Sequence, residues 1–468
     1  MSRVLPYAVR GGGNRARDSR GGSKMGSQKP SVLGRESRMA TWRNWAGNQI
    51  AHPQSIECPR DVTELAAVVA GASSRGQKVK AVGSGHSFTS AAATDGRMIR
   101  LDNLSGISHV DRAKNQVTVG AGTRLSDLNT LLHAEGLALA NLGDIAYQTV
   151  AGAISTSTHG TGKALTGLAG QVVAMTLVNG HGEIIECSES SNADILDVGR
   201  VSVGALGVIS EYTLQAVPSF RLRALEQPMR LDDVLESAHE LAAAHDHFEF
   251  FWIPHTKWAL TKRNNRTDDE LQPLPKVKGW IEKTFMENYA FGALCRIGRA
   301  RPSLIPRLAT ALPSSGSREY VDQSFKIFAS PRIVRFYEME HSLPVEAVAP
   351  ALREIRAMIE RKGYLLNFPV EVRFTKGDDV PLSTAYGRDS AYIAVHVYKG
   401  MECEPFFRDV EDILRGYDAR PHWGKVHYRE ADELSALYPR WNDFIALRDQ
   451  LDPLRTFSNA YTDTVFGK

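Results

Sequence analysis

The chain has 468 residues, a length that favours two domains over a single hydrophobic core. A formal net charge of +3 gives no electrostatic reason to expect a nucleic-acid partner, and no apolar run is long enough to span a bilayer. The four cysteines lie too far apart for a disulfide framework or a zinc site. We therefore expect reduced thiols, no metal and no transmembrane segment. A cytoplasmic location follows, with peripheral contact to a membrane left open.

Residues 1–38 differ in composition from the rest of the chain. They are rich in Gly, Ser and basic residues, and they have neither an apolar period nor the apolar stretch of a secretory signal. Two interpretations stay open: a disordered basic tail, or an overlong start with true initiation near Met25 or Met39. In both cases the segment is expected to carry no chemistry.

From Asp61 the pattern predicts regular structure. Asp61 and Glu64 resemble a capping box, and apolar residues then recur at helical spacing as far as Gly76. A strand over 79–82 and a helix over 125–135 follow. Apolar residues 172–178, a turn at 180–182 and residues 183–187 predict a β-hairpin. Residues 42–218 are therefore predicted to form one α+β domain.

Around Pro218 glycines become fewer and aromatic residues more frequent. Amphipathic helices are predicted over 231–244, 345–362 and 406–417, and they alternate with strands over 248–252, 368–374 and 392–398. This alternation predicts a second α+β domain over 219–420, with helices covering one face of its sheet. Residues 421–468 form a Gly/His/Trp-bearing loop and a short helical tail.

Two loops of the first domain are suited to a polar, extended ligand. In residues 82–88, VGSGHSF, glycines allow close approach of the backbone, whose N–H groups can bind a pyrophosphate. Residues 150–162 are nearly all small or hydroxyl-bearing, and Asn141-Leu142-Gly143-Asp144 lies just before them. Two other nucleotide-binding motifs are disfavoured. Gly85 is not followed by the third glycine of a Rossmann fingerprint, and Gly162-Lys163 lacks the Ser or Thr of a P-loop.

Polar residues also alternate along two strands of the second domain. In residues 368–374, Glu371 and Arg373 share one face and apolar residues the other, and in residues 392–398 His396 lies on the face opposite Val395. If the two strands are neighbours, Glu371, Arg373 and His396 converge on one polar surface, where a carboxylate and a guanidinium can hold vicinal hydroxyls.

The order of these features resembles the vanillyl-alcohol-oxidase type of FAD enzyme over about residues 42–468. The similarity is greatest to the aldonolactone oxidases and dehydrogenases, which include the L-gulono-1,4-lactone and D-arabinono-1,4-lactone enzymes, with alditol oxidase related. In the C-terminal half, the motifs that carry this resemblance are Glu371-Val372-Arg373, Ala394-Val395-His396 and His422-Trp423-Gly424-Lys425. The resemblance implies an α+β fold with a PCMH-type FAD domain over 42–218. It also implies a cap domain with an antiparallel sheet over 219–420, and a segment 421–468 that returns to the flavin site.

The resemblance also implies residue roles. His86 would carry a covalent link to the flavin, and Glu371, Arg373, His396 and Lys425 would be catalytic. Lys425 would lie near flavin N1 or near the substrate hydroxyl, and the sequence does not choose between them. The implied FAD-binding residues are Val82, Gly83, Ser84, Gly85, His86, Ser87, Gly143, Asp144, Ala151, Gly152, Ser155, Thr156, Thr158, His159, Val208, Ile209 and Lys425.

The function implied is oxidation of a sugar-lactone hydroxyl by hydride transfer to flavin N5. The substrate would be L-gulono-1,4-lactone or D-arabinono-1,4-lactone, and the product a 2-keto lactone of the ascorbate type. The acceptor of electrons would be oxygen, a cytochrome or a dye, and the sequence does not separate an oxidase from a dehydrogenase. Two alternatives remain, an alditol oxidase and a non-catalytic flavin-binding protein. A hydrolase is disfavoured because no GxSxG is present, and His245-Asp246-His247 is interpreted as a helix end rather than a metal site.

Overall fold

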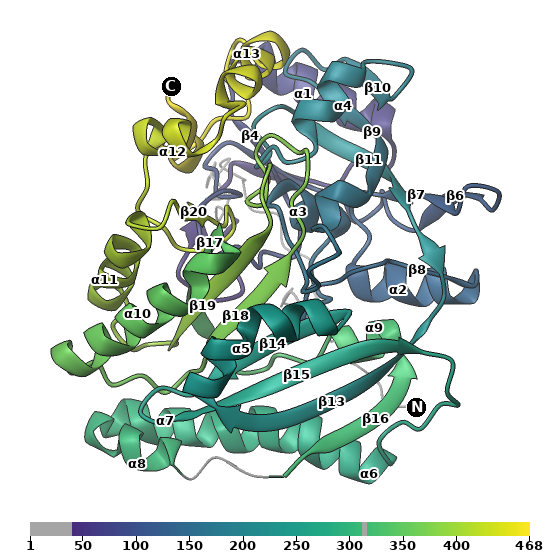
Figure 1. The fold of residues 1–468 in the computed structure, drawn as a ribbon. Helices are drawn as coiled ribbons and strands as arrows, with labels where there is room; N and C mark the ends of the chain where they lie inside the picture. Colours follow the sequence, from purple (N-terminus) through teal and green to yellow (C-terminus); the bar gives the residue numbers. More distant parts are fainter. Residues whose placement is uncertain (1–39, 311–315) are drawn as a thin grey trace, which may run out of the picture. The chain divides into compact units, whose positions relative to one another are not determined.

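The computed structural model of the chain describes residues 40–310 and 316–468, so the predictions for residues 1–38 lie outside the described residues. Residues Met39–Lys468 form one compact unit that contains several sheets (Figure 1). No helix in the part of the chain that the structure describes is both long and apolar enough to cross a bilayer.

The N-terminal part, up to Pro218, is built on two main sheets. A parallel three-stranded sheet has the order β3-β5-β4, and an antiparallel five-stranded sheet has the order β10-β9-β11-β7-β6. Their strands are β3 (Ser55–Glu57), β4 (Val79–Val82), β5 (Arg97–Arg100), β6 (Ile107–Asp111), β7 (Gln116–Gly120), β9 (Val172–Val178), β10 (Ile184–Ser188) and β11 (Val208–Gln215). Short pairs join β1 (Trp42–Arg43) to β2 (Ile50–Ala51) and β8 (Leu137–Ala138) to β12 (Val217–Pro218).

Helices α1 (Val62–Ser73), α2 (Leu125–Ala134), α3 (Val150–Ser155) and α4 (Ala193–Gly199) pack in the same core as these sheets. The predicted hairpin is confirmed, since β9 and β10 pair antiparallel around the turn. Asp61 does cap α1 by accepting from Glu64 N at 2.8 Å, but Glu64 accepts from Arg60 N rather than completing the box with Asp61.

One expectation was wrong in this part. Residues 150–162 were expected to form a loop throughout, but Val150–Ser155 form helix α3, which is capped by the Thr149 hydroxyl. Val150, Ala153 and Ile154 are buried at helical spacing, so three apolar side chains are enough to fold the first half of this small-residue run onto the core.

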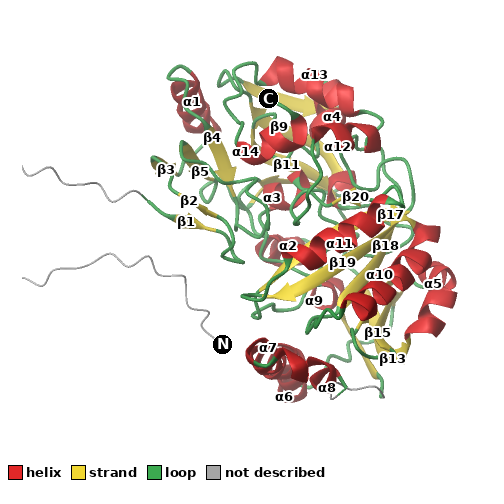
Figure 2. Ribbon diagram, turned by 90° about the vertical axis from the view of Figure 1, so that its left-hand side faces the viewer, coloured by secondary structure: helices red, strands yellow, loops and turns green. Residues whose placement is uncertain are grey.

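The C-terminal part is dominated by an eight-stranded antiparallel sheet of order β16-β13-β15-β14-β18-β19-β17-β20. The strands are β13 (Arg221–Arg230), β14 (His247–Trp252), β15 (Trp258–Thr267), β16 (Arg318–Gln323), β17 (Phe336–Pro344), β18 (Val370–Thr375), β19 (Ser390–Tyr398) and β20 (Arg420–Pro421). Helices α5 (Leu231–Ala244), α10 (Val348–Lys362) and α11 (Glu404–Arg415) cover one face, as predicted (Figures 1 and 2). The opposite face is also buried, and it is polar.

The remaining helices lie at the edge and at the C-terminal end of the chain. Helices α6 (Lys276–Gly279) and α7 (Phe291–Ala300) flank the π-helix Trp280–Ala290, and α8 (Ile305–Ala309) and α9 (Ser324–Phe328) are short. Helices α12 (Ala431–Leu437), α13 (Trp441–Leu451) and α14 (Ala460–Phe466) return to the core of the N-terminal part, where Trp423, Phe444 and Phe466 are buried. The chain therefore crosses between the two parts near residue 218 and near residue 421, and the segment after β18 also places Val380 and Leu382 in the N-terminal core.

Asn459 fixes this returning segment. Its side chain caps α14 by accepting from Thr462 N at 3.0 Å, and its Nδ2 donates to the carbonyls of Ser90 and Ala93 at 2.9 and 2.8 Å.

We expect Asn459→Ala to lower the free energy of unfolding by about 2–3 kcal/mol, because a helix cap and the donors to partly buried carbonyls are lost together. Thermal unfolding followed by flavin fluorescence measures the effect. Asn103→Ala is the control, because its Nδ2 bonds lie at the exposed surface, where water replaces them. Equal midpoints for both variants would contradict an anchoring role for Asn459.

Candidate active site

The predicted pyrophosphate loop, residues 83–88, directly follows β4 and contacts two other segments. A Cβ on Gly83 would lie 2.2 Å from Thr149 Oγ1, at the start of α3, so only glycine fits there. Gly85 adopts φ +69°, which favours glycine. On the other side Phe88 N donates to Gly424 O at 2.7 Å. The structure thus brings together the two predicted FAD loops and the His422–Lys425 segment.

His86 lies between two aromatic rings in this loop. Its ring centroid is 5.5 Å from that of Trp45 and 6.4 Å from that of Tyr147, with small interplanar angles in both pairs. Burial, together with the charges of Lys425 and Arg124, lowers the pKa of His86 to about 4. The imidazole is therefore neutral at physiological pH and keeps a free ring-nitrogen lone pair.

The other predicted FAD-binding residues form a cradle of small side chains. The 141–144 and 158–160 loops run side by side, since a Cβ on Gly160 would lie 2.2 Å from Leu142 O and one on Gly143 3.2 Å from His159 O. Close backbone approach of this kind suits a pyrophosphate or ribityl chain. Three members of the set differ: Val82, Val208 and Ile209 have side chains buried in the core, so any contact they make with FAD would use the backbone.

Asp144, which the resemblance implied to be an FAD-binding residue, forms ion pairs with two arginines. Its carboxylate pairs with Arg332 and lies 3.2 Å from Arg373 Nη2, so it joins the N-terminal part to the large sheet. Burial alone would raise the pKa of Asp144, but Arg373 and Arg332 hold it well below the usual range. Asp144 is an ion-pair partner of the predicted catalytic arginine as well as a neighbour of the FAD loops.

The predicted convergence of Glu371, Arg373 and His396 is confirmed by the strand register. β18 and β19 pair antiparallel, with Glu371 opposite Ala394 and Arg373 opposite Tyr392. Two further strands add carboxylates that the sequence analysis missed: Glu249 lies opposite Arg373, and Glu338 lies opposite His396. The sequence did contain a sign of Glu338, because Glu338 and Glu340 alternate with Met339 as residues on one face of a strand do.

Arg373 is the centre of one half of this polar face. Its guanidinium pairs with Glu371, with Asp144 and with Glu249 Oε2 at 3.1 Å, and all these side chains are buried or nearly so. Arg332 also pairs with Asp144, and Lys262 Nζ lies 3.4 Å from Glu249 Oε1, whereas Glu371 has Arg373 as its only ion-pair partner among the described residues. Burial raises the pKa of Glu371 to about 7, against the opposing effect of Arg373, and the charges of Asp144 and Glu249 add to the rise.

Lys425 is the centre of the other half. Its ammonium pairs with Glu338 and lies 3.9 Å from Glu340 Oε2, and these carboxylates raise the pKa of Lys425 although burial opposes them. His396 Nδ1 donates to Pro369 O at 2.9 Å and its Nε2 lies 3.5 Å from Glu338 Oε1. Burial lowers the pKa of His396, but Glu338, Glu371 and the Pro369 carbonyl together raise it by more. Both residues are therefore donors at neutral pH.

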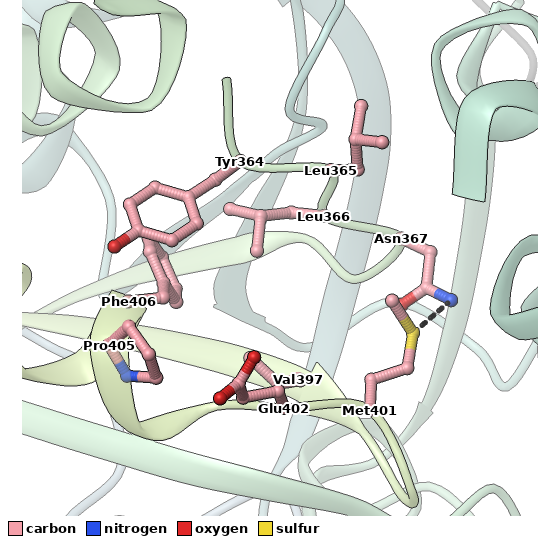
Figure 3. Close-up of a pocket in the computed structure, with 9 residues that line it drawn as sticks. All are labelled: Tyr364, Leu365, Leu366, Asn367, Val397, Met401, Glu402, Pro405 and Phe406. Carbon is pink, nitrogen blue, oxygen red and sulfur yellow. Dashed lines mark hydrogen bonds between the residues drawn. The ribbon is translucent and has the colours of Figure 1, made fainter. Parts of the chain in front are cut away.

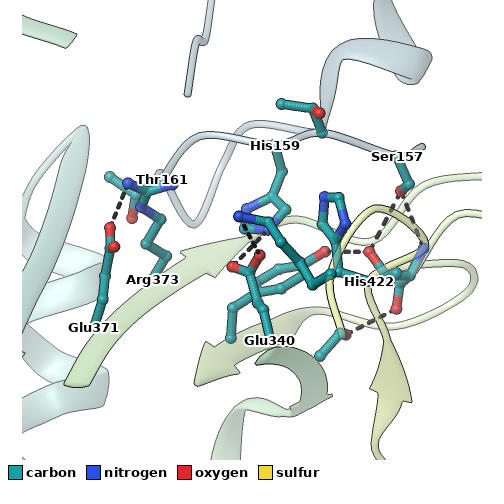
Figure 4. A network of polar contacts seen from close by, with 12 residues as sticks. Ser157, His159, Thr161, Glu340, Glu371, Arg373 and His422 are labelled. Carbon is teal, nitrogen blue, oxygen red and sulfur yellow. Dashed lines mark hydrogen bonds and ion pairs between the residues drawn. The ribbon is translucent and has the colours of Figure 1, made fainter. Parts of the chain in front are cut away.

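His159 and His422 extend this network behind Glu340 (Figure 4). His159 Nε2 lies 3.2 Å from Glu340 Oε1, its Nδ1 donates to Gly160 O, and its ring stacks on Tyr392 with 3.5 Å between centroids. His159, Glu340 and His422 are near enough to one another to hold a metal ion. However, His422 Nδ1 accepts from Gly424 N at 3.0 Å, and burial lowers the pKa of His422 to about 3. Its Nε2 therefore carries the proton, which makes it a poor metal ligand, while its backbone N donates to Glu340 O at 3.0 Å.

A separate pocket of about 160 Å³ lies between the end of α10 and the start of α11 (Figure 3). Its lining includes Tyr364, Asn367, Met401 and Phe406, and none of the predicted site residues. The polar face beside the His86 loop remains the candidate site.

Comparison with known proteins agrees with this geometry. The family model for D-arabinono-1,4-lactone oxidase matches residues 212–465, and that for the FAD binding domain matches residues 53–188. The chain belongs to the D-arabinono-1,4-lactone oxidase family. Members of this family are FAD-dependent oxidoreductases, and FAD is the cofactor of this chain. The glycine cradle and the neutral His86 fit that cofactor.

Curated relatives of this family cover nearly the whole chain. The L-gulono-1,4-lactone dehydrogenase of Mycobacterium tuberculosis is 44% identical over 427 residues, which are 91% of this chain and 99% of that protein. The L-gulonolactone oxidase of Bos taurus is 36% identical over 438 residues, 91% of this chain and 98% of that protein. Among solved structures, the cholesterol oxidase of Brevibacterium sterolicum matches with a TM-score of 0.78 at 17% identity, covering 94% of this chain and 99% of that one. That match shows a shared fold, the vanillyl-alcohol-oxidase type.

The raised pKa of Glu371 predicts an unusual pH dependence of stability. Between its ordinary value of 4.5 and about 7, the folded protein binds more protons at this carboxyl than the unfolded chain does. Stability should therefore fall as the pH rises through this window, and Glu371→Gln should remove that loss. Thermal unfolding midpoints are measured from about pH 5 to about pH 8, and the midpoint of Glu371→Gln relative to that of wild type should rise as the pH rises.

Asp144→Asn is the control, because the pKa of Asp144 is shifted in the opposite direction to that of Glu371. Because the folded-state pKa of Asp144 lies below 3.8, its contribution is constant over that range and is lost only on further acidification. A Glu371→Gln variant that parallels wild type at every pH would show that Glu371 does not titrate there.

Proposed function

We propose that this enzyme oxidises the hydroxyl next to the carbonyl of an aldono-1,4-lactone, and that L-gulono-1,4-lactone is its preferred substrate. The observation that carries the proposal is the buried polar face of β14, β18, β19 and β17, which lies beside the His86 loop and presents Arg373 and Lys425 among carboxylates. The names of the relatives support a lactone. They give no support to the two alternatives, an alditol oxidase or a non-catalytic flavin-binding protein.

The proposed catalytic roles follow from charge and protonation. Bound FAD supplies the hydride acceptor. Arg373 and Lys425 remain cations and stabilise negative charge that develops on the substrate oxygen. Glu371 holds a hydroxyl, and because its pKa is about 7 its carboxylate is suited to accept the hydroxyl proton at neutral pH. His396, kept as a donor by Glu338, hydrogen-bonds another ring oxygen.

We propose that residues 83–87 and 151–159 bind FAD at and around its pyrophosphate, and that residues 219–420 form the substrate domain. We also propose that Lys425 serves both the cofactor and the substrate, which its neighbours support: its Nζ lies 5.4 Å from the ring of Phe88, two residues after His86, while it pairs with Glu338. This supports a position beside both the flavin ring and the substrate hydroxyl.

We further propose that the enzyme works in the reducing cytoplasm and passes electrons to oxygen or to a cytochrome or dye. All four cysteines, Cys58, Cys187, Cys295 and Cys403, are free, which supports a reducing compartment. Parallel turnover assays with oxygen, cytochrome c and a dye would identify the acceptor.

The substrate proposal is tested by mixing the enzyme anaerobically with single substrates in a stopped-flow instrument. We expect L-gulono-1,4-lactone and D-arabinono-1,4-lactone to bleach the flavin absorbance, and alditols such as xylitol to do so more slowly. Lys425→Met should reduce the bleaching rate by about a hundredfold, because the charge opposite the developing alkoxide is lost. Arg373→Lys should have an effect of similar size, because a lysine cannot replace the forked contacts of a guanidinium.

Lys376→Met is the matched control, since Lys376 is exposed one residue beyond β18. Rates in Lys425→Met within about threefold of wild type, a loss below roughly one kcal/mol, would exclude a catalytic charge role for Lys425. Faster reduction by xylitol than by either lactone would replace the lactone proposal with the alditol alternative.

We also propose that His86 bonds covalently to the flavin, which its neutral, stacked imidazole supports. After acid precipitation the flavin of wild type should remain in the protein pellet, whereas that of His86→Ala should appear in the supernatant. Both proteins should contain FAD before precipitation, because the cradle at Gly83 and Gly143 is unchanged. Flavin released from wild type by acid would disprove the link while leaving FAD binding intact.

A further inference from the structure

An apolar face is exposed along one helical run of the C-terminal part. Helix α6, the π-helix Trp280–Ala290 and α7 follow one another without a break, beyond the strands β13, β15 and β16 (Figures 1 and 2). Six of the fifteen large apolar side chains that are exposed in the described residues lie within residues 277–289: Val277, Trp280, Ile281, Phe285, Met286 and Tyr289. Val277 is 72% exposed and Trp280 55%. Such a concentration on one element indicates an interaction surface.

The aromatic members of this group form a continuous stripe. The rings of Trp280 and Phe285 lie 6.1 Å apart, and those of Phe285 and Tyr289 lie 6.4 Å apart. Trp280 and Phe285 are five residues apart and Phe285 and Tyr289 four, so the wider turn of a π-helix brings all three rings to one side. We name Trp280, Phe285 and Tyr289 the aromatic stripe.

The inner side of the same run is fixed to the body of the protein. Phe291 packs edge-on against Phe368 at 4.9 Å, and Asn367 Nδ2 donates to Cys295 O at 3.3 Å. Gly298 lies so close to Ile305 that an added Cβ would be 2.9 Å from Ile305 Cγ1. The stripe is therefore the outer side of an anchored helix, held in position by contacts on its other side.

The surroundings of the stripe are strongly basic. Residues 276–307 contain seven lysines and arginines and only two glutamates, whereas the whole chain has a formal net charge of +3. Lys276, Arg296, Arg301 and Arg307 are exposed, and none of them has an ion-pair partner among the described residues. Aromatic and aliphatic side chains flanked by unpaired cations are the features of a helix that lies in the interface of an anionic bilayer.

We propose that the α6–α7 run docks this enzyme on a lipid surface that contains anionic headgroups, with the aromatic stripe inserted among the lipids. A second copy of the chain is a poorer occupant, because a twofold contact through this face would bring the same cations together. A bilayer accepts an outward-facing helix directly, whereas a protein partner would need a groove to receive it. The proposal is independent of the substrate and of the flavin chemistry.

The test is co-sedimentation of the full-length, FAD-loaded enzyme with sucrose-filled vesicles. Vesicles of phosphatidylcholine alone are compared with vesicles that also contain phosphatidylglycerol, at low and at high salt. We expect sedimentation with the anionic vesicles only, weakened by salt because the cations are exposed. The variant Trp280→Ser/Phe285→Ser/Tyr289→Ser should partition at least about tenfold more weakly, and Arg296→Glu/Arg301→Glu should do the same, while both keep wild-type turnover of soluble lactone.

The matched control is Ile184→Ser/Leu454→Ser, which removes exposed apolar side chains elsewhere and should bind as wild type does. The proposal is overturned if wild type stays in the supernatant with both kinds of vesicle. It is equally overturned if the aromatic-stripe variant sediments like wild type, since another basic segment such as residues 1–38 would then carry the binding. Analytical ultracentrifugation tests whether a second copy of the chain occupies this face. If wild type forms a dimer, the aromatic-stripe variant does not, and neither binds vesicles, the face would serve self-association and the lipid proposal would be overturned.

Discussion

The site depends on a single buried guanidinium. Arg373 joins Glu371 on its own strand, Glu249 on β14 and Asp144 on a loop of the N-terminal part, so one side chain holds three elements. Buried charges are tolerated only when they are paired and hydrogen-bonded. Asp144 has Arg332 and Glu249 has Lys262 as a second cation, whereas Glu371 pairs with Arg373 alone among the described residues. The imbalance is resolved by protonation, because the pKa of Glu371 rises while that of Asp144 falls. The constraint that fixes the two parts of the molecule against each other therefore also creates a carboxyl that can exchange a proton near neutral pH.

The second constraint is made by backbone atoms of the returning segment. His422 N donates to Glu340 O at 3.0 Å and Val426 N to Glu338 O at 2.9 Å, so residues 422–426 follow the edge of β17. This register carries Lys425 to the two glutamate side chains, while Phe88 N binds Gly424 O on the opposite side. The distance between the His86 loop and the polar face is thereby set by main-chain hydrogen bonds, which tolerate side-chain changes nearby. Trp423, fully buried and donating to Leu382 O at 2.8 Å, fixes the turn between them.

Much of the fold could be predicted from periodicity, because apolar spacing reports burial directly. The β9–β10 hairpin, α5 and the polar alternation of β18 and β19 were all predicted at nearly their observed bounds. Helix α3 was missed because Ala151, Gly152 and Ser155 carry little local preference, and its folding depends on burial of Val150 and Ile154 by distant segments. Glu249, Glu338 and Glu340 were missed for a similar reason: strand order is a long-range property, and only pairing across β14, β18, β19 and β17 shows that these residues reach Arg373 and Lys425. Motif spacing found His86 and Lys425 and gave no sign that their side chains influence each other.

That influence resolves a conflict between two requirements of the site. A histidine that is to bond through a ring nitrogen must be neutral, whereas a residue that stabilises negative charge must keep its proton, and both lie in the same buried region. Lys425 serves both requirements. Its ammonium lowers the pKa of His86, and Glu338 and Glu340 raise the pKa of Lys425 itself. The two glutamates lie on the side of Lys425 that faces the sheet, so they act on the lysine without supplying a carboxylate partner that would recharge His86. A lysine without these carboxylates would lose its proton to burial, and the imidazole would lose a charge that adds to the effect of burial in keeping it neutral. The protonation states of the cofactor loop and of the substrate face are therefore set together by one residue and its two strand neighbours.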